Sequence, residues 1–174
     1  MKKIILSLLV IGFAFNSVAQ DEKETYVSPK HYIGLHAGAT TGYGLSYRYW
    51  PTKLGVELTT SPYIESKGNY NISTGLSVLY SLFENKYIGL YSYLGNSLVV
   101  TNSNSIQVYN PNTGGYTFGE KSTKYNVGLG MGFKVNVFKE LDFNIQTGYG
   151  FYNLNKADDF YTFLTGEISI YYHF

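Results

Sequence analysis

The chain has 174 residues, with 13 Lys and Arg against 12 Asp and Glu, and no cysteine. The near-neutral charge argues against nucleic acid as a partner, which needs a clustered basic surface, and the missing cysteines exclude disulfides as a source of stability. Charged residues make up only 14% of the chain, against about 25% in soluble domains, while tyrosine alone numbers 19. Because the mean hydropathy is only −0.11, this composition favours a membrane β-barrel, in which half of each strand faces a polar interior.

The N-terminus has the three parts of a secretory signal peptide. Lys2 and Lys3 precede an apolar stretch at residues 4–15, which is too short for a bilayer-spanning helix of about 20 residues. The small residues Ser17 and Ala19 then predict cleavage after Ala19; an uncleaved membrane anchor is the alternative. We therefore expect a signal peptide at 1–19, a flexible periplasmic tail at 20–30 and an outer-membrane barrel at 31–174. Removing residues 1–19 takes two lysines and no acidic residue, which leaves 11 basic and 12 acidic side chains.

Apolar residues alternate with small or polar ones in eight runs, and a period of two predicts strands with one apolar face. The sixth run is the clearest, and it is longer than the 5 to 6 residues that are usual for a strand in a soluble protein. The fifth leaves its phase open, because Ile88 and Leu90 compete with Tyr91 and Tyr93 for the apolar face. The predicted strands are 33–39, 43–49, 54–59, 70–82, 87–100, 125–137, 141–151 and 160–174.

The connections alternate in length, short after the second, fourth and sixth runs and longer after the third, fifth and seventh. Outer-membrane barrels have short periplasmic turns and longer external loops, with both termini inside. The first external connection, residues 40–42, is the exception and is tight. The longest, residues 101–124, reads as two strand extensions around a turn. If those extensions crossed the membrane the barrel would have ten strands, for which the chain is short.

The C-terminal run ends on an aromatic residue and carries apolar side chains at every second position. In this arrangement the chain resembles the small eight-stranded bacterial outer-membrane β-barrels of the OmpX, OmpA-barrel or OmpW-like type, and its Tyr- and Gly-rich style resembles the outer-membrane β-barrel domain family of Bacteroidetes. The resemblance implies an all-β, antiparallel, up-and-down transmembrane barrel in the outer membrane of a Gram-negative bacterium. It also implies that the terminal pattern is the signal read by the barrel-assembly machinery. The matching residues are Ile168, Ile170, Tyr172 and Phe174.

The face that carries Gly, Ser and Asn is assigned to the lumen, and its charged members should neutralise one another because an unpaired charge in a narrow interior is costly. A two-residue turn at Thr52 and Lys53 would place Arg48 directly opposite Glu57. The ordinary interpretation is a set of structural ion pairs that fill the lumen, and the alternative is a gate or small ion path. The predicted charge network consists of Arg48, Glu57, Lys134, Asp142 and Glu167.

The three histidines raise the question of catalysis, because small outer-membrane barrels include lipid A deacylases and palmitoyltransferases that use His with Ser or Asp. His36 has lumen phase, while His31 and His173 lie near the periplasmic end. No Ser or carboxylate stands at a diagnostic spacing from His36, although cross-strand neighbours stay open. The histidines also form no spaced ligand set for a metal, and we expect no cofactor. The sequence therefore predicts a protein that is not an enzyme, with a lipid A-modifying enzyme as one alternative.

Tyrosines of lipid-facing phase gather near the strand ends, where aromatic belts meet the headgroups. They include Tyr43, Tyr47, Tyr49, Tyr70, Tyr80, Tyr125, Tyr149 and Tyr172. Aromatic residues in the longest loop could instead stack on carbohydrate. The loop residues predicted to bind at the surface are Ile106, Val108, Tyr109, Tyr116 and Phe118.

The leading functional hypothesis is a plugged, non-enzymatic barrel that supports envelope integrity or surface interaction through its external loops. Its expected partners are outer-membrane lipid, lipopolysaccharide, the barrel-assembly machinery and an extracellular ligand or protein. A second hypothesis is a passive pore or carrier for small hydrophobic solutes, which would need a continuous lumen.

Overall fold

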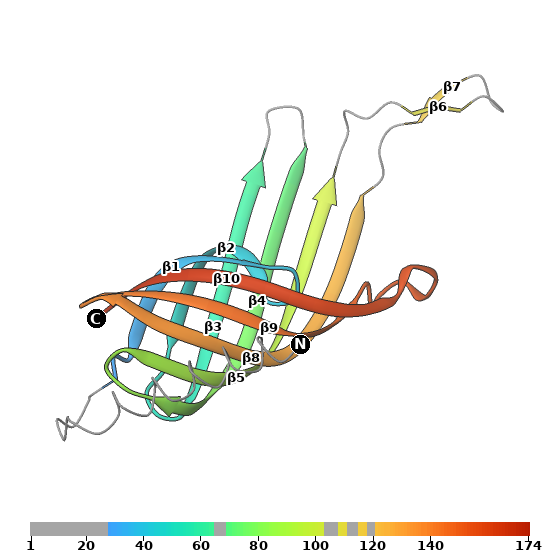
Figure 1. The fold of residues 1–174 in the computed structure, drawn as a ribbon. Coiled ribbons are helices and arrows are strands. Elements are labelled where there is room, and N and C mark those ends of the chain that lie inside the picture. The colour runs from blue at the N-terminus through green and yellow to red at the C-terminus, as the bar shows by residue number, and fades with distance from the viewer. Residues whose placement is uncertain (1–27, 65–68, 103–107, 111–114, 118–120) are drawn as a thin grey trace, which may run out of the picture.

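Eight antiparallel strands close into a barrel in which each strand pairs with its neighbour in the chain and the last strand pairs with the first (Figure 1). The computed structural model describes residues 28–64, 69–102, 108–110, 115–117 and 121–174. The predicted eight-stranded, up-and-down, all-β barrel is therefore confirmed. The predicted signal peptide and most of the predicted tail lie outside the described residues and stay predictions. The barrel strands are β1 (His31–Gly38), β2 (Gly42–Tyr49), β3 (Leu54–Ile64), β4 (Tyr70–Glu84), β5 (Ile88–Asn102), β8 (Ser122–Phe138), β9 (Leu141–Tyr152) and β10 (Tyr161–His173).

Two shorter strands lie in the connection between β5 and β8. These are β6 (Val108–Asn110) and β7 (Gly115–Thr117), which form a separate two-stranded sheet (Figure 1). The predicted hairpin is thus not part of the barrel wall. Within the described part of the chain, no helix is both long and apolar enough to cross a membrane.

Burial alternates along the central part of each barrel strand, as the period of two requires. In β10, Thr165, Glu167, Ser169 and Tyr171 are buried, whereas the residues between them point outward and are exposed. The buried side chains are mostly polar or charged and the exposed ones are mostly large and apolar. This distribution is the inverse of a soluble domain, whose interior is apolar.

The open phase of the fifth run is settled by the fold. Tyr91 and Tyr93 point into the barrel, with 1% and 4% of their surfaces exposed, whereas Leu94 and Leu98 face outward. The cross-strand partners of the two tyrosines on β8 are Gly132 and Gly130, and a Cβ atom at Gly132 would collide with the Tyr91 ring.

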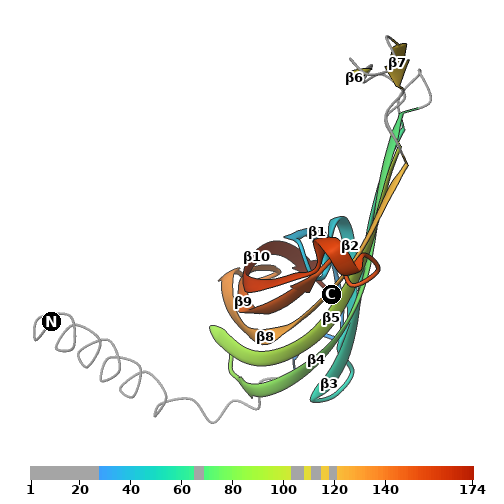
Figure 2. The same cartoon turned by 90° about the vertical axis from the view of Figure 1, so that its right-hand side faces the viewer.

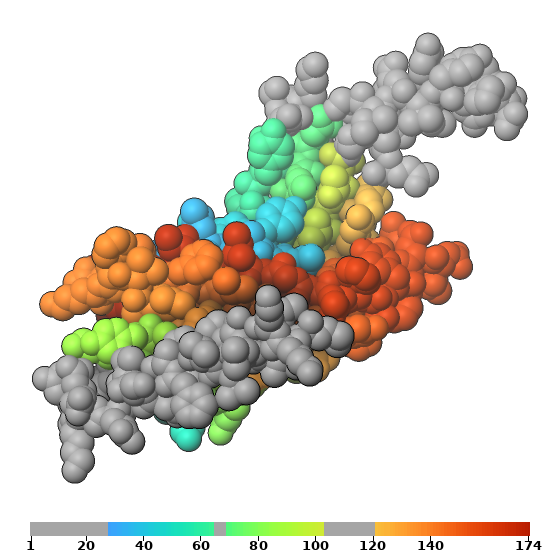
Figure 3. All heavy atoms as spheres, in the orientation of Figure 1, coloured from blue at the N-terminus to red at the C-terminus, as the bar shows by residue number. Residues whose placement is uncertain are grey.

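Four neighbouring strands continue past the rim of the barrel as a sheet that stands along one side (Figures 1 and 2). We call this sheet the outer extension, and it comprises Ser61–Ile64, Tyr70–Ser73, Val99–Asn102 and Ser122–Lys124. Its pairing is continuous, because Ser61 lies opposite Ser73, Ser73 opposite Val99 and Val99 opposite Lys124. In the space-filling view the same four strands rise clear of the rest of the barrel (Figure 3).

Three local features differ from the sequence interpretation. β3 continues past Pro62 to Ile64, whereas the alternation in the sequence predicts that it ends at residue 59. A register shift between Ser81 and Phe83 turns Glu84 toward the interior, opposite Gly89. Tyr43, assigned to the lipid face, instead directs its hydroxyl to Asn71 Oδ1 at 2.8 Å, on the inward side of β4.

Candidate functional site

All five side chains of the predicted charge network lie inside the barrel. Each is at most 1% exposed, a degree of burial that charged groups tolerate only when they are paired and hydrogen-bonded. They come from β2, β3, β8, β9 and β10, so the closed sheet brings them together from across the sequence. They are Arg48, Glu57, Lys134, Asp142 and Glu167.

Arg48 lies directly opposite Glu57 in the pairing of β2 with β3. Its Nε and Nη2 atoms lie 2.8 and 2.6 Å from Glu57 Oε2, and Nη1 donates to Asn144 Oδ1 at 3.1 Å. The Tyr171 hydroxyl donates to the same Glu57 oxygen at 2.9 Å. The carboxylate therefore accepts from two strands at once and fixes the guanidinium in the middle of the lumen.

Aromatic rings surround this guanidinium. The Cζ atom of Arg48 lies 4.4 Å from the ring centroid of Tyr171, 5.4 Å from Tyr91 and 5.5 Å from Trp50. At these distances a cation is attracted to the face of an aromatic ring. We refer to these aromatic residues, with Arg48, Glu57 and Tyr32, as the arginine layer, and all of them are buried inside the barrel.

Lys134 and Asp142 have charged or titratable partners of their own, although Lys134 Nζ also lies 3.5 Å from the hydroxyl of Tyr32 in the arginine layer. Lys134 forms an ion pair with Glu84, the last residue of β4. Asp142 Oδ2 lies 3.2 Å from His173 Nδ1. Neither Glu84 nor His173 belongs to the predicted network, so its charges are balanced partly by residues that the sequence interpretation had not assigned to it.

His36 sits between the arginine layer and the outer end of the lumen. Its Nδ1 lies 3.4 Å from Glu57 Oε1, its Nε2 lies 3.6 Å from Glu167 Oε2, and Nε2 is also 2.5 Å from the hydroxyl of Thr41. The cross-strand neighbours left open by the sequence are thus a threonine and two glutamates. All four side chains are buried at the centre of the molecule.

A hydrolase would need a nucleophile that a substrate can approach. Thr41, the hydroxyl next to His36, is 0% exposed and directs its hydrogen to Glu167 Oε2 at 2.5 Å. The hydroxyl is thus turned away from solvent and from the lipid face. Within the described ranges, no group of three or more His, Asp or Glu residues is arranged to hold a metal ion. The arrangement supports a structural role for this cluster.

Sequence reasoning missed the aromatic half of the arginine layer. Trp50 stands in the turn after β2, where alternation gives no direction, yet it is only 6% exposed and donates from Nε1 to Lys53 O at 3.2 Å. A side chain at Gly55 would collide with the indole ring, and one at Gly132 with the ring of Tyr91. Glycines of lumen phase opposite aromatic residues were the signal that could have located this layer.

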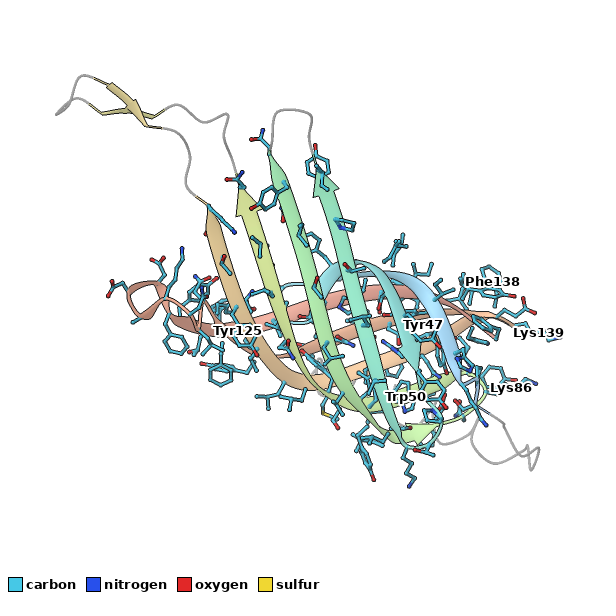
Figure 4. The ribbon with its side chains drawn as sticks, turned by 180° about the vertical axis from the view of Figure 1, so that it is seen from behind. Tyr47, Trp50, Lys86, Tyr125, Phe138 and Lys139 are labelled. Atoms are coloured by element: carbon cyan, nitrogen blue, oxygen red, sulfur yellow. The ribbon has the colours of Figure 1, made fainter. Side chains whose placement is uncertain are left out.

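Large apolar side chains cover the outer surface. On β8, Leu129, Met131 and Phe133 are all exposed, and β10 presents its apolar residues in the same way. Figure 4 shows Lys86, Phe138 and Lys139 at one end of the barrel and Tyr125 toward the other. Aromatic and cationic side chains at both limits of an apolar band match the two interfaces of a bilayer.

The predicted assembly signal lies on this outer surface. Ile168, Ile170, Tyr172 and Phe174 are all exposed, and the ring of Phe174 stacks on His31 with a centroid distance of 5.7 Å. The amide of Phe174 donates to the carbonyl of His31 at 3.0 Å, which joins the two ends of the barrel sheet. Recognition of this pattern by an assembly machinery stays a prediction.

The described members of the predicted surface-binding set, Val108, Tyr109 and Tyr116, lie in the β6–β7 hairpin. Val108 pairs with Thr117, and Tyr109 pairs with Tyr116. Ile106 and Phe118, which were also predicted to bind, lie outside the described residues.

No protein-family model and no curated protein sequence matches the chain. Among solved structures, it is similar to the N-terminal β-barrel domain of OprF from Pseudomonas aeruginosa, with 17% identity, a TM-score of 0.45, and 83% of this chain and 96% of the other covered. It is also similar to Neisserial surface protein A, with 15% identity, a TM-score of 0.40 and coverages of 83% and 94%. A third similar structure is Ail, the attachment invasion locus protein of Yersinia pestis, in complex with the heparin analogue sucrose octasulfate. It is 20% identical, with a TM-score of 0.35 and coverages of 83% and 94%.

Proposed function

We propose that this protein is an integral, non-enzymatic barrel of the bacterial outer membrane, closed at its lumen and specialised for surface interaction through its external side. The observation that carries the proposal is the inverted distribution of side chains, with charge inside and large apolar residues outside. In water such a surface would drive aggregation, because soluble monomers rarely expose apolar patches of more than a few hundred Å². In a bilayer the same surface is solvated by lipid.

The orientation follows from the ends of the chain. β1 begins and β10 ends beside the short turns. The Trp50 amide donates to Lys30 O, and the His173 amide donates to Glu140 O. In an outer-membrane barrel this is the periplasmic end. The outer extension, the β6–β7 hairpin and the turn that contains Ala157 then face the outside of the cell.

Single cysteines test this placement, because the chain contains none of its own. In intact cells, a membrane-impermeant thiol reagent should label Ala157→Cys, which lies in an exposed external turn. The matched control is Thr52→Cys in the exposed β2–β3 turn, which should react only after the cells are broken. Equal labelling of both variants in intact cells would overturn the proposal.

The filled interior supports a barrel that is closed at neutral pH. The side chains of the arginine layer are buried at one level of the lumen, and Thr40 and Thr41, both 0% exposed, lie at the next level outward. An eight-stranded barrel is only wide enough for such side chains. We expect no steady conductance from the purified protein in planar bilayers at neutral pH. Sustained channels under those conditions would favour the pore hypothesis instead.

Surface interaction is assigned to the outer extension and the β6–β7 hairpin, with Val108, Tyr109 and Tyr116 in the hairpin and Ile106 and Phe118 close to it in the sequence. Strands that leave the barrel wall offer edges and faces to an extracellular protein or glycan. Deletion of residues 106–118 should leave the barrel folded and remove binding to arrays of glycans and secreted proteins. Loss of folding would instead show that this segment supports the barrel wall.

A further inference from the structure

The turn between β1 and β2 fills the outer end of the lumen, although a tight hairpin could equally have pointed away from it. We call Ala39–Gly42 the turn plug. The carbonyl of Ala39 accepts hydrogen bonds from Ser97 Oγ at 2.8 Å and Asn126 Nδ2 at 2.9 Å, on the far wall of the barrel. The turn plug is therefore bonded across the lumen to β5 and β8.

Glycines on three strands make room for the turn plug. A Cβ atom at Gly75 would collide with the backbone of Thr41, one at Gly95 with the Thr41 methyl group, and one at Gly128 with Thr40. These glycines lie on β4, β5 and β8, so three strands of the wall make the space and not one local contact. The turn itself uses Gly42, whose φ of +89° is unfavourable for any residue with a side chain.

One carboxylate holds the turn plug from β10, the strand that pairs with β1. Glu167 Oε1 accepts from the Thr40 amide at 3.0 Å and from the Thr40 hydroxyl at 2.6 Å, and Oε2 accepts from the Thr41 hydroxyl at 2.5 Å. Thr165 on the same strand adds a fourth donor at 3.2 Å. Four donors converge on a group that is acceptor-only when it is ionised.

His36 extends this arrangement. The Thr41 hydroxyl has one hydrogen and gives it to Glu167, so the 2.5 Å contact between Thr41 and His36 Nε2 requires that Nε2 donate. The opposite ring nitrogen, Nδ1, faces Glu57. The histidine thus links the carboxylate that holds the turn plug to the arginine layer beneath it.

Protonation of Glu167 would place a hydrogen on an oxygen that already accepts hydrogen bonds. At least one threonine donor would then lose its partner inside a site that excludes water, which favours release of the turn plug. Other titratable or charged groups near Glu167 come from β1, β2, β3 and β5. The inward residues at this level on the remaining strands β4, β8 and β9 are uncharged, and they are Gly75, Asn126 and Gln146. These titratable or charged groups are His36, Arg48, Glu57 and Tyr93.

We propose that the turn plug is an acid-releasable lid, held in the lumen by ionised Glu167 and freed when that carboxylate takes up a proton. Its release exposes a pocket lined by Ser77, Gly75 and Gly95 above the arginine layer, which stays in place. The external position of this pocket rests on the proposed function, but the hold of Glu167 on the turn plug does not. It is therefore tested on purified protein in detergent micelles, where cellular location has no influence.

Ser77→Cys is the probe, because Ser77 is 1% exposed and its hydroxyl lies beside Gly95 under the Thr41 methyl group. A charged methanethiosulfonate reagent should label it slowly at about pH 7.5. Its rate is divided by that of the exposed Ala157→Cys at each pH, which cancels the common change in thiolate fraction. We expect this ratio to rise at least about tenfold by about pH 3, well below the ordinary Glu pKa of about 4.3, since labelling follows the population of the open form. A ratio that stays constant with pH would overturn the proposal.

Glu167→Gln tests the same carboxylate without acid. Combined with Ser77→Cys, it should raise the labelling ratio at about pH 7.5 to the level that the parent reaches in acid. Glu84→Gln is the matched control, because it also neutralises an inward carboxylate but at the periplasmic end, where Lys134 is its partner. A labelling ratio that stays low in folded Glu167→Gln protein would contradict the proposal that Glu167 holds the turn plug. If that variant fails to fold, Thr41→Val removes one donor at nearly constant volume and should give the same increase.

Discussion

The inner and outer faces of the same strands follow opposite rules. On β8 the inward Lys134 is 1% exposed and bonded to Glu84, whereas the outward Met131 is 46% exposed. The inner face depends on specific partners, because each buried charge is stable only with its counter-charge. The outer face depends on its apolar character alone, since lipid accepts any side chain of that kind. The effect of a substitution on stability should therefore depend on the lost partner for an inward residue and on the depth in the membrane for an outward residue.

The largest effect is expected for Arg48→Met. It leaves Glu57 ionised and without its counter-charge at the centre of the barrel, which should lower the free energy of unfolding by about 3–5 kcal/mol. Urea unfolding in detergent micelles measures the change. The double variant Arg48→Met with Glu57→Gln should recover a large part of the loss. If the loss of unfolding free energy in the double variant equals the sum of the losses in the two single variants, the inner face does not depend on pairing.

The outer face is tested by Met131→Arg, a charge placed in the middle of the apolar band. It should cost about 2–4 kcal/mol in lipid, measured by reversible unfolding from vesicles. Val137→Arg is the matched control, because it lies near the end of the strand and should cost about 0–1 kcal/mol. Equal tolerance at both positions would mean that the outer face does not lie in a bilayer.

A smaller effect is expected where two strands approach closely. A methyl group at Gly130 would meet the Thr147 carbonyl of β9, so Gly130→Ala should destabilise the barrel by about 1–3 kcal/mol. Gly166→Ala is the control, since its added methyl group would have nothing within 4 Å, and it should be close to neutral. The same unfolding assay ranks the two, and equal losses would show that space on the inner side does not decide the outcome.

Regular alternation made most of the fold predictable from the sequence. A period of two locates strands and sorts their faces, and a turn of two residues is enough to put Arg48 opposite Glu57. Irregular positions could not be predicted. The register shift after Ser81 reverses the phase, so Glu84, which follows the outward residues, turns in to meet Lys134.

The turn plug was hidden for a different reason. Thr40, Thr41 and Gly42 indicate a tight turn, but they do not say whether it bends into the lumen or away from it. That choice is made by Glu167, more than 120 residues away in the sequence, and by glycines on other strands. Trp50 was missed in the same way, because a residue in a turn has no alternation to orient it.

The central claim is that this is a folded barrel that lies in a membrane. The most direct measurement is the gel mobility of the protein from an outer-membrane fraction in SDS, with and without boiling. We predict faster migration of the unboiled sample and a shift to the position of the unfolded chain after heating, because the closed sheet has no free edge from which SDS can begin to open it. Recovery in the soluble periplasm, with no change of mobility on boiling, would contradict the account.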